Sequence, residues 1–392
     1  MRAGRLMAAV VLFASMSAAK DAMAGNLACV PTGGKLYVDA SAADYIEVID
    51  LETRKAVKKI KVGKHPHGLA LGCRVVGGQE FNYVYATVES TGELVIVDAQ
   101  RDKVVKRVKV GRVPNQLTIT ADGGAVYVPL REEARVAVVR LDYKVTSIYR
   151  FSDGGWDSYF DYRPKVIKRI PIGEWPHNAY TGQTTGRVYV TSFKGKKIHV
   201  FDPKKDDELA YEMEFPGEVR PVALSRDETR AYVAQSGLHG FLVADLVERK
   251  VIERVELPPL PPETPVPYLN TYVHGLTLSP DEKELWVTSC AGAAVYVYSV
   301  PELKLRGKVG TGKFPHWFAW EKRKTTGETL VPLTESTRNS AQDKAMPYPE
   351  GWLLWVSQME SNQVSAIDPV KREVVATVPT GPAPRRIVIS NQ

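Results

Sequence analysis

The sequence predicts an all-β protein, a seven-bladed β-propeller built from four-stranded antiparallel blades. Three observations lead to this fold. A phrase of strand, turn, strand ending in Asp, strand ending in Gly and then Pro-His-Gly (or a variant of it) returns along the chain. No useful window after residue 24 has the periodicity of an amphipathic helix. The two ends of the chain also carry complementary parts of one blade.

Residues 1–24 are predicted to be an export signal. Arg2 and Arg5 form a basic start, an apolar run follows, and Ala22-Met23-Ala24 is a small-x-small cleavage site. The run is too short to span a membrane, and no other segment is apolar enough to do so. We therefore expect two parts, the signal at 1–24 and a single propeller at 25–392, with the mature protein periplasmic or secreted.

Composition places the mature chain among ordinary globular proteins, with 44% hydrophobic and 25% charged residues over the full sequence. Removing residues 1–24 takes away three basic residues and one acidic residue, which lowers the formal net charge from +7 to +5. The basic residues are scattered along the predicted strands, and no aromatic stacking platform is interleaved with them. This pattern favours a solvated surface and argues against nucleic acid as a partner.

The repeat is clearest at residues 83–120, 187–225 and 284–320, where short β-branched and aromatic runs alternate with Gly, Asp, Pro and Ser turns. Aligning the turn before each first strand gives seven anchor positions. They are His67, Asn115, His177, Pro221, His274, His316 and Arg385. Seven units of four strands each bury their sheets against their neighbours in a ring.

The two ends of the chain predict how the ring closes. Residues 35–63 supply three strands and lack the first one, whereas residues 385–390 supply a first strand with nothing after it. Pairing the C-terminal strand with the N-terminal blade completes the seventh sheet. It also removes an open edge on which another chain could pair.

The stretches "YVDAS", "YVTSF", "VTSCAGAAVYVYS", "VGKHPHGLALG" and "HGLTLSPDEKELWVTS" resemble the YVTN family of β-propeller repeats. The resemblance extends over essentially the whole chain after residue 24 and implies the propeller fold. It does not imply one function, because related propellers serve as binding modules, surface proteins and enzymes.

Six of the seven histidines are predicted on one face. In such a blade the loop that leads into the first strand (the leading loop) and the loop between strands two and three emerge on the same side. His65, His67, His177, His274 and His316 lie in or just after leading loops, and His239 lies in a loop between strands two and three. His199, in a third strand, is the exception, and His65 is expected further out than the anchors.

Equivalent positions in a ring converge on its axis, so the anchors are candidates for one shared ligand site. The predicted set is His67, Asn115, His177, Arg220, His274, His316 and Arg385, with Gln116 and Arg386 beside it. Its amide and guanidinium groups suit an anion. The four histidines alone could hold a transition metal such as copper. The alternative is that each histidine is only a turn residue copied with the repeat.

The three cysteines and three insertions give further expectations. Cys29 and Cys73 are predicted on the opposite face in neighbouring blades, where a disulfide between them is plausible in an oxidising compartment. Cys290 belongs to the histidine face, as a metal ligand or an inert buried thiol. Of the insertions, 258–272 enters the histidine face, whereas 151–164 and 322–350 map to the opposite one.

The favoured function is an exported monomer that binds a small molecule or a protein through the histidine face. The alternative is a metal-dependent oxidoreductase or lyase, in which one histidine is the base and Glu89 or Glu360 helps to hold the ion. Nucleic-acid binding, known for some YVTN propellers, is the least favoured.

Overall fold

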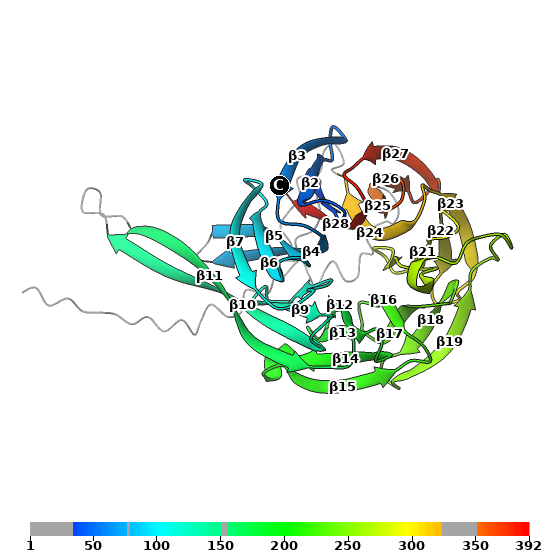
Figure 1. Ribbon diagram of the computed structural model, residues 1–392, viewed down its shortest axis with the longest axis horizontal. Helices are drawn as coiled ribbons and strands as arrows, with labels where there is room; N and C mark the ends of the chain where they lie inside the picture. Colours follow the sequence, from blue (N-terminus) through cyan, green and yellow to red (C-terminus); the bar gives the residue numbers. More distant parts are fainter. Residues whose placement is uncertain (1–33, 77–78, 150–155, 324–350, 392) are drawn as a thin grey trace, which may run out of the picture.

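The computed structural model describes residues 34–76, 79–149, 156–323 and 351–391. These residues form seven four-stranded antiparallel sheets around one axis, which confirms the predicted propeller (Figure 1). Among them, no helix has the length and apolar character that crossing a membrane requires. The predicted signal, Cys29 and residues 324–350 of the third insertion lie outside the described part.

Each blade runs from an innermost strand at the axis to an outermost strand at the rim. In that order, blade 1 is β28 (Pro384–Asn391), β1 (Gly34–Ala40), β2 (Tyr45–Asp50) and β3 (Lys55–Lys61); blade 2 is β4 (Pro66–Val76), β5 (Gln79–Val88), β6 (Glu93–Asp98) and β7 (Lys103–Lys109); blade 3 is β8 (Thr118–Ile119), β9 (Ala125–Leu130), β10 (Arg135–Tyr149) and β11 (Trp156–Pro171). Blade 4 is β12 (Pro176–Thr181), β13 (Val188–Ser192), β14 (Lys197–Asp202) and β15 (Glu208–Glu214), and blade 5 is β16 (Val219–Leu224), β17 (Arg230–Gln235), β18 (Gly240–Asp245) and β19 (Lys250–Glu256). Blade 6 is β20 (Leu276–Leu278), β21 (Glu284–Ser289), β22 (Ala294–Ser299) and β23 (Leu305–Gly310), and blade 7 is β24 (Pro315–Lys322), β25 (Trp352–Gln358), β26 (Gln363–Asp368) and β27 (Glu373–Pro379). Two 3₁₀ helices, η1 (Pro203–Lys205) and η2 (Tyr268–Asn270), lie in loops.

Burial decreases from the axis outward because each blade packs its middle strands against the next blade. The second and third strands are almost wholly buried, whereas in the outer strand β3 only Ile60 is buried. The apolar cores lie between blades: Trp286 of blade 6 packs with Phe318 and Leu354 of blade 7. Burying such large side chains on both faces of every sheet is what a ring achieves and an isolated blade cannot.

Blade 1 closes the ring as predicted, with β28 pairing antiparallel to β1. The Asp39 carboxylate, fully buried in β1, accepts hydrogen bonds from the backbone N–H groups of Arg385 (2.6 Å) and Arg386 (2.7 Å). The Ser41 hydroxyl donates to its other oxygen. One side chain therefore fixes both termini of the described chain at the closure.

Most blades carry a β-bulge at the start of the first strand, where two consecutive residues leave the ladder. In β4 the register shifts between Pro66 and Leu69, and β12 and β24 shift at the equivalent places. A second-strand hydroxyl accepts the backbone N–H that the bulge frees: Gly68 to Thr87, Asn178 to Thr191, Gly275 to Thr288 and Trp317 to Ser357. This gives the threonine of the "YVT" phrase a structural task.

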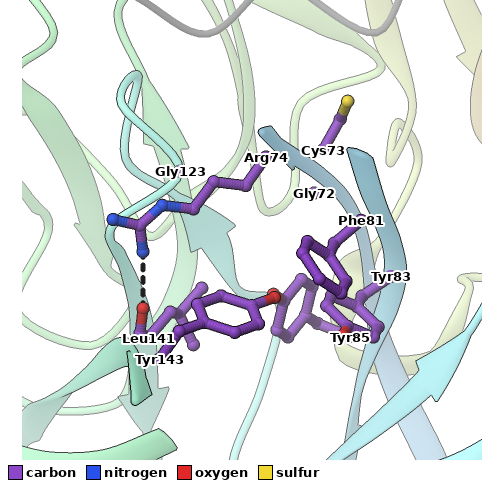
Figure 2. A pocket seen from close by; sticks show the side chains of 9 residues that line it. All are labelled: Gly72, Cys73, Arg74, Phe81, Tyr83, Tyr85, Gly123, Leu141 and Tyr143. Carbon is purple, nitrogen blue, oxygen red and sulfur yellow. Dashed lines mark hydrogen bonds between the residues drawn. The ribbon is translucent and has the colours of Figure 1, made fainter. Parts of the chain in front are cut away.

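The long hairpin β10–β11 extends from the ring (Figure 1), and part of the predicted insertion 151–164 forms its second strand. The hairpin packs against the β4–β5 hairpin through an aromatic cluster that includes Tyr83, Tyr143 and Tyr162. Figure 2 shows the small cavity beside it, of about 10 Å³, with Arg74 donating to the Leu141 carbonyl. Tyr162, an aromatic residue of this insertion, is thus buried and packs within the protein.

Gly68 lies where blades 2 and 3 approach each other closely. A β-carbon there would lie 2.6 Å from the Asn115 carbonyl oxygen and 2.9 Å from the Gln116 α-carbon. Because backbone cannot yield as a flexible side chain does, we expect Gly68→Ala to lower the free energy of unfolding by about 1–3 kcal/mol. Gly310→Ala is the control, with no atom within 4 Å, and should stay within about 0.5 kcal/mol in urea denaturation. Equal effects would contradict the account.

Asp39 gives the closure a pH dependence. Burial raises the pKa of its carboxyl from 3.8 to about 7, although the two amide bonds and the arginine charges oppose the rise. Between those values the folded protein keeps a proton that the unfolded chain releases, so this site loses stability as pH rises from about 4 to about 7.

Asp39→Asn keeps an oxygen acceptor for both N–H groups and cannot ionise. Its stability relative to the natural protein should therefore increase by about 1.4 kcal/mol per pH unit up to pH 7 and then stay constant. Urea denaturation from pH 5 to 8 measures this, and a constant difference over the whole range would refute it.

Candidate functional site

The leading loops and the loops between strands two and three lie on one face in all blades. In each blade a backbone N–H of the latter loop donates to a carbonyl of the former. Examples are Glu89 to His65 (3.0 Å), Phe193 to Trp175 (2.9 Å) and Met359 to Phe314 (3.0 Å). The structure therefore places six histidines on this face (the histidine face), as the sequence predicts, and His199 on β14.

Blade 5 requires one correction to the predicted anchors. Its register shift runs from Val219 to Val222, which matches Pro66 to Leu69 in blade 2 and makes Arg220, rather than Pro221, the residue equivalent to His67. The alignment slipped by one because "GEVRP" has its proline after the anchor instead of before it. Arg220 is buried, donates to Ser236 (2.9 Å) and to the Leu269 carbonyl (2.7 Å), and lies over the Phe193 ring.

Three of the four anchor histidines touch one another. His274 and His316 stack with ring centroids 3.6 Å apart, and His177 lies edge-on to His274 at 6.2 Å. All four, His67 included, are buried. Burial first, and then the positive charges of neighbouring arginines and histidines, hold their pKa values well below the ordinary 6.5. The site consequently presents neutral imidazoles at neutral pH.

Arg386 is the cation at the centre of this group. Its side chain is 0% exposed and crosses between blades: Nε donates to the Gln116 side-chain oxygen (3.0 Å), and the guanidinium lies 4.0 Å from the centre of the Trp317 ring. Nη1 is 3.2 Å from Nδ1 of His316. Burial lowers the Arg386 pKa to about 10, so the guanidinium remains charged at neutral pH.

Several polar atoms around Arg386 are buried without a hydrogen-bond partner among the described residues. They are Nη2 of Arg386, Nδ2 of Asn115 and Nδ1 of His67, His177 and His274. Within the same described residues, neither Arg386 nor Arg220 has a carboxylate within ion-pair distance. A buried cation and buried polar atoms without hydrogen-bond partners are costly unless another group satisfies them.

Arg385, the predicted anchor of blade 1, is only partly buried, and its backbone is what binds its neighbours: the N–H donates to Asp39, and the carbonyl faces His316 and Ser357. The bulge brings the next residue, Arg386, into the site instead. Sequence reasoning named Arg386 only as a neighbour, because it allowed one inward residue per blade where a bulge provides two.

Within the described ranges, no three side chains of His, Cys, Asp and Glu form a group that could hold a metal ion. Of the two carboxylates considered for that role, Glu89 is half-buried and lies 3.9 Å from Arg131, and Glu360 is exposed. Copper binding by His67, His177, His274 and His316 stays a prediction.

Neither described cysteine, Cys73 or Cys290, forms a disulfide with another described residue. Cys290 is buried and donates to the Pro315 carbonyl, and burial raises its pKa to about 12, so it is an inert thiol at neutral pH. Cys73 lies within β4, the first strand of blade 2, and it contacts Glu80. Because Cys29 lies outside the described residues, the disulfide between them remains a prediction.

No protein-family model and no curated protein matches the chain. Solved structures match in fold. A functionally unknown protein from Desulfotomaculum acetoxidans has a TM-score of 0.62 at 14% identity, covering 92% of this chain and 99% of that one. Hydrazine synthase of Kuenenia stuttgartiensis has 0.61 at 14%, covering 86% and 93%. The dihydro-heme d1 dehydrogenase NirN in complex with DHE has 0.54 at 12%, and the chain, 88% of which is covered, spans 63% of its length.

The neutral histidines predict loss of stability in acid. Below pH 6.5 the histidines of the unfolded chain bind protons, whereas the buried imidazoles of the folded protein stay neutral. The free energy of unfolding is therefore highest above pH 6.5 and decreases as the pH falls below it. The loss is about 1.4 kcal/mol per pH unit for each histidine. His274→Phe can still stack on His316, loses no bond at Nδ1 and cannot titrate.

We expect the variant to lose about 1 kcal/mol less than the natural protein between pH 6.5 and 5.5, because the unfolded imidazole is already half protonated at pH 6.5. Urea denaturation at pH 7.5, 6.5 and 5.5 provides the comparison. Parallel losses in the two proteins would show that His274 is protonated in the folded state.

Proposed function

We propose that this protein is an exported monomeric propeller that binds a small organic anion through the histidine face. The observation that carries the proposal is Arg386, a fully buried guanidinium with one unpartnered nitrogen and no carboxylate within ion-pair distance among the described residues. Arg220, buried on the same face, adds a second positive charge.

The donors around Arg386 support an anion as the missing partner. Nη2 of Arg386 and Nδ2 of Asn115 can only donate, and the free Nδ1 atoms of His67, His177 and His274 can do so as neutral imidazoles. Hydrogen bonds between charged donors and an anionic oxygen are short and about twice as strong as neutral ones. An acid group that accepts several of these hydrogen bonds would supply the partners that the buried nitrogen atoms lack.

The fixed position of the Arg386 guanidinium favours ligand binding. Gln116 and Trp317, from blades 3 and 7, hold the guanidinium on two sides. A preorganised cation loses little conformational freedom when a ligand arrives, so more of the interaction free energy appears as affinity. The different activities named for the structural neighbours do not select among ligands, since those matches concern the fold.

Arg386→Gln tests the proposal, with acetate and formate as probes in titration calorimetry. A hydrogen bond to a charged group contributes about 1.5–3 kcal/mol, so its loss should weaken acetate binding at least tenfold. Arg163→Gln, an exposed arginine of β11 paired with Asp161, is the control and should bind as the natural protein does.

Stability without ligand gives an independent readout. Replacing a buried charge that has no ion pair by an apolar side chain of similar length is often neutral or stabilising, so Arg386→Met should unfold at the same or a higher urea concentration. If neither acid binds, or if Arg386→Gln binds them unchanged, the proposal is wrong.

A further inference from the structure

A second set of side chains surrounds the anchors on the histidine face. The residue two positions before the anchor has positive φ in five blades, although none is glycine: His65 (57°), Val113 (50°), Trp175 (55°), Phe314 (57°) and Ala383 (52°). Each precedes a proline. Because residues of five different types take the same left-handed backbone here, the fold determines the backbone conformation and not the side chain. The side chain at this position can therefore vary with the function of the histidine face. Trp175 uses this freedom most, because it is the largest of them and is 37% exposed.

A continuous run of rings connects Trp175 with the buried histidines. Trp175 stacks on Phe193 with centroids 5.7 Å apart, and Phe193 lies 5.8 Å from His177. His177 in turn contacts His274. Of these rings only Trp175 is exposed, because Phe193 is buried with 1% exposure. Trp175 is thus the accessible end of a run of rings that leads to the group that we propose binds an acid.

Cations surround the same rings. Arg131 and Lys194 lie 5.7 Å and 5.5 Å from the centre of the Trp175 ring, and Arg220 lies 4.4 Å from the centre of Phe193. Arg131 comes from blade 3, Lys194 from blade 4 and Arg220 from blade 5. The sequence indicated no aromatic platform among basic residues, and this arrangement corrects that expectation. Lys194 is already paired with Glu218, and Arg131 lies 3.9 Å from Glu89. Arg220, which has no carboxylate within ion-pair distance among the described residues, is therefore the cation left to attract a negative charge, while the flat rings attract a second ring.

We infer that the ligand is an aromatic acid with a planar body of about two fused rings. The body lies on the exposed ring of Trp175 (the platform), and its acid group points past the buried Phe193 toward Arg220, His177 and Arg386. This inference rests on the proposed function and adds the substrate class. A simple aliphatic acid would leave the platform unused, whereas a neutral aromatic would leave the buried charge unmet.

The probes are acetate, 2-naphthoate and uncharged 2-naphthylmethanol, measured by titration calorimetry with tryptophan fluorescence alongside. The natural protein should bind 2-naphthoate at least tenfold more tightly than acetate, and 2-naphthylmethanol more weakly than 2-naphthoate by a similar factor. Trp175→Val should reduce the advantage of naphthoate over acetate to about twofold and leave acetate unchanged. Valine is suitable because Val113 already takes the same backbone conformation in blade 3.

Tyr159→Val, at an exposed aromatic of β11, is the matched control and should not change any of the three affinities. Naphthoate binding that is as tight in Trp175→Val as in the natural protein overturns the inference. Equal binding of 2-naphthylmethanol and 2-naphthoate also overturns it. In both cases acetate binding that depends on Arg386 would still support the proposed function. If Arg386→Gln leaves acetate and naphthoate binding unchanged, the proposed function itself fails.

Discussion

The structure depends on the closure of the ring by β28 and β1, and the closure depends on one buried carboxylate. Asp39 accepts the backbone N–H groups of Arg385 and Arg386, the two residues that the bulge of β28 removes from the ladder. Other blades use a threonine or serine hydroxyl for the equivalent bond. Only a group with two acceptor oxygens can take both N–H bonds and that of Ser41 together. The same contact that closes the fold therefore also delivers Arg386 to the axis.

Delivering a guanidinium to a dry interior is unfavourable unless its surroundings compensate. Stacking on Trp317 and the bond to Gln116 compensate in part. The Asp39 carboxyl, which lies beyond ion-pair distance, also favours the charged guanidinium when it is ionised. The neighbouring histidines remain neutral, first because burial disfavours a charged imidazole and then because protonation would add a like charge to an already charged interior. Fold and charge are coupled in this way: the bulge in β28 places the charged Arg386 at the axis, and this charge disfavours protonation of the anchor histidines.

Repetition made the fold predictable from sequence. Seven copies of a strand pattern, with complementary ends, determine the blades, the closure and the face that carries six histidines. The site was less predictable because it depends on features that the repeat hides. A bulge turns two residues inward where one was expected, so Arg386 rather than Arg385 is central. The role that we propose for Trp175 depends on its contacts with Arg131 and Lys194. These two residues lie near its ring but are distant from it in the sequence. The local sequence pattern does not predict such contacts.

The position of Arg386 also bears on the choice between an anion and a metal ion. Its Nη1 lies 3.2 Å from Nδ1 of His316, so this guanidinium already occupies one of the nitrogens that a metal could use. A divalent cation among the histidines would meet the charges of Arg386 and Arg220 in a buried setting, where repulsion is little screened. An anion meets attraction from both. The charge that the closure carries to the axis thus favours an acid at this site over a cation.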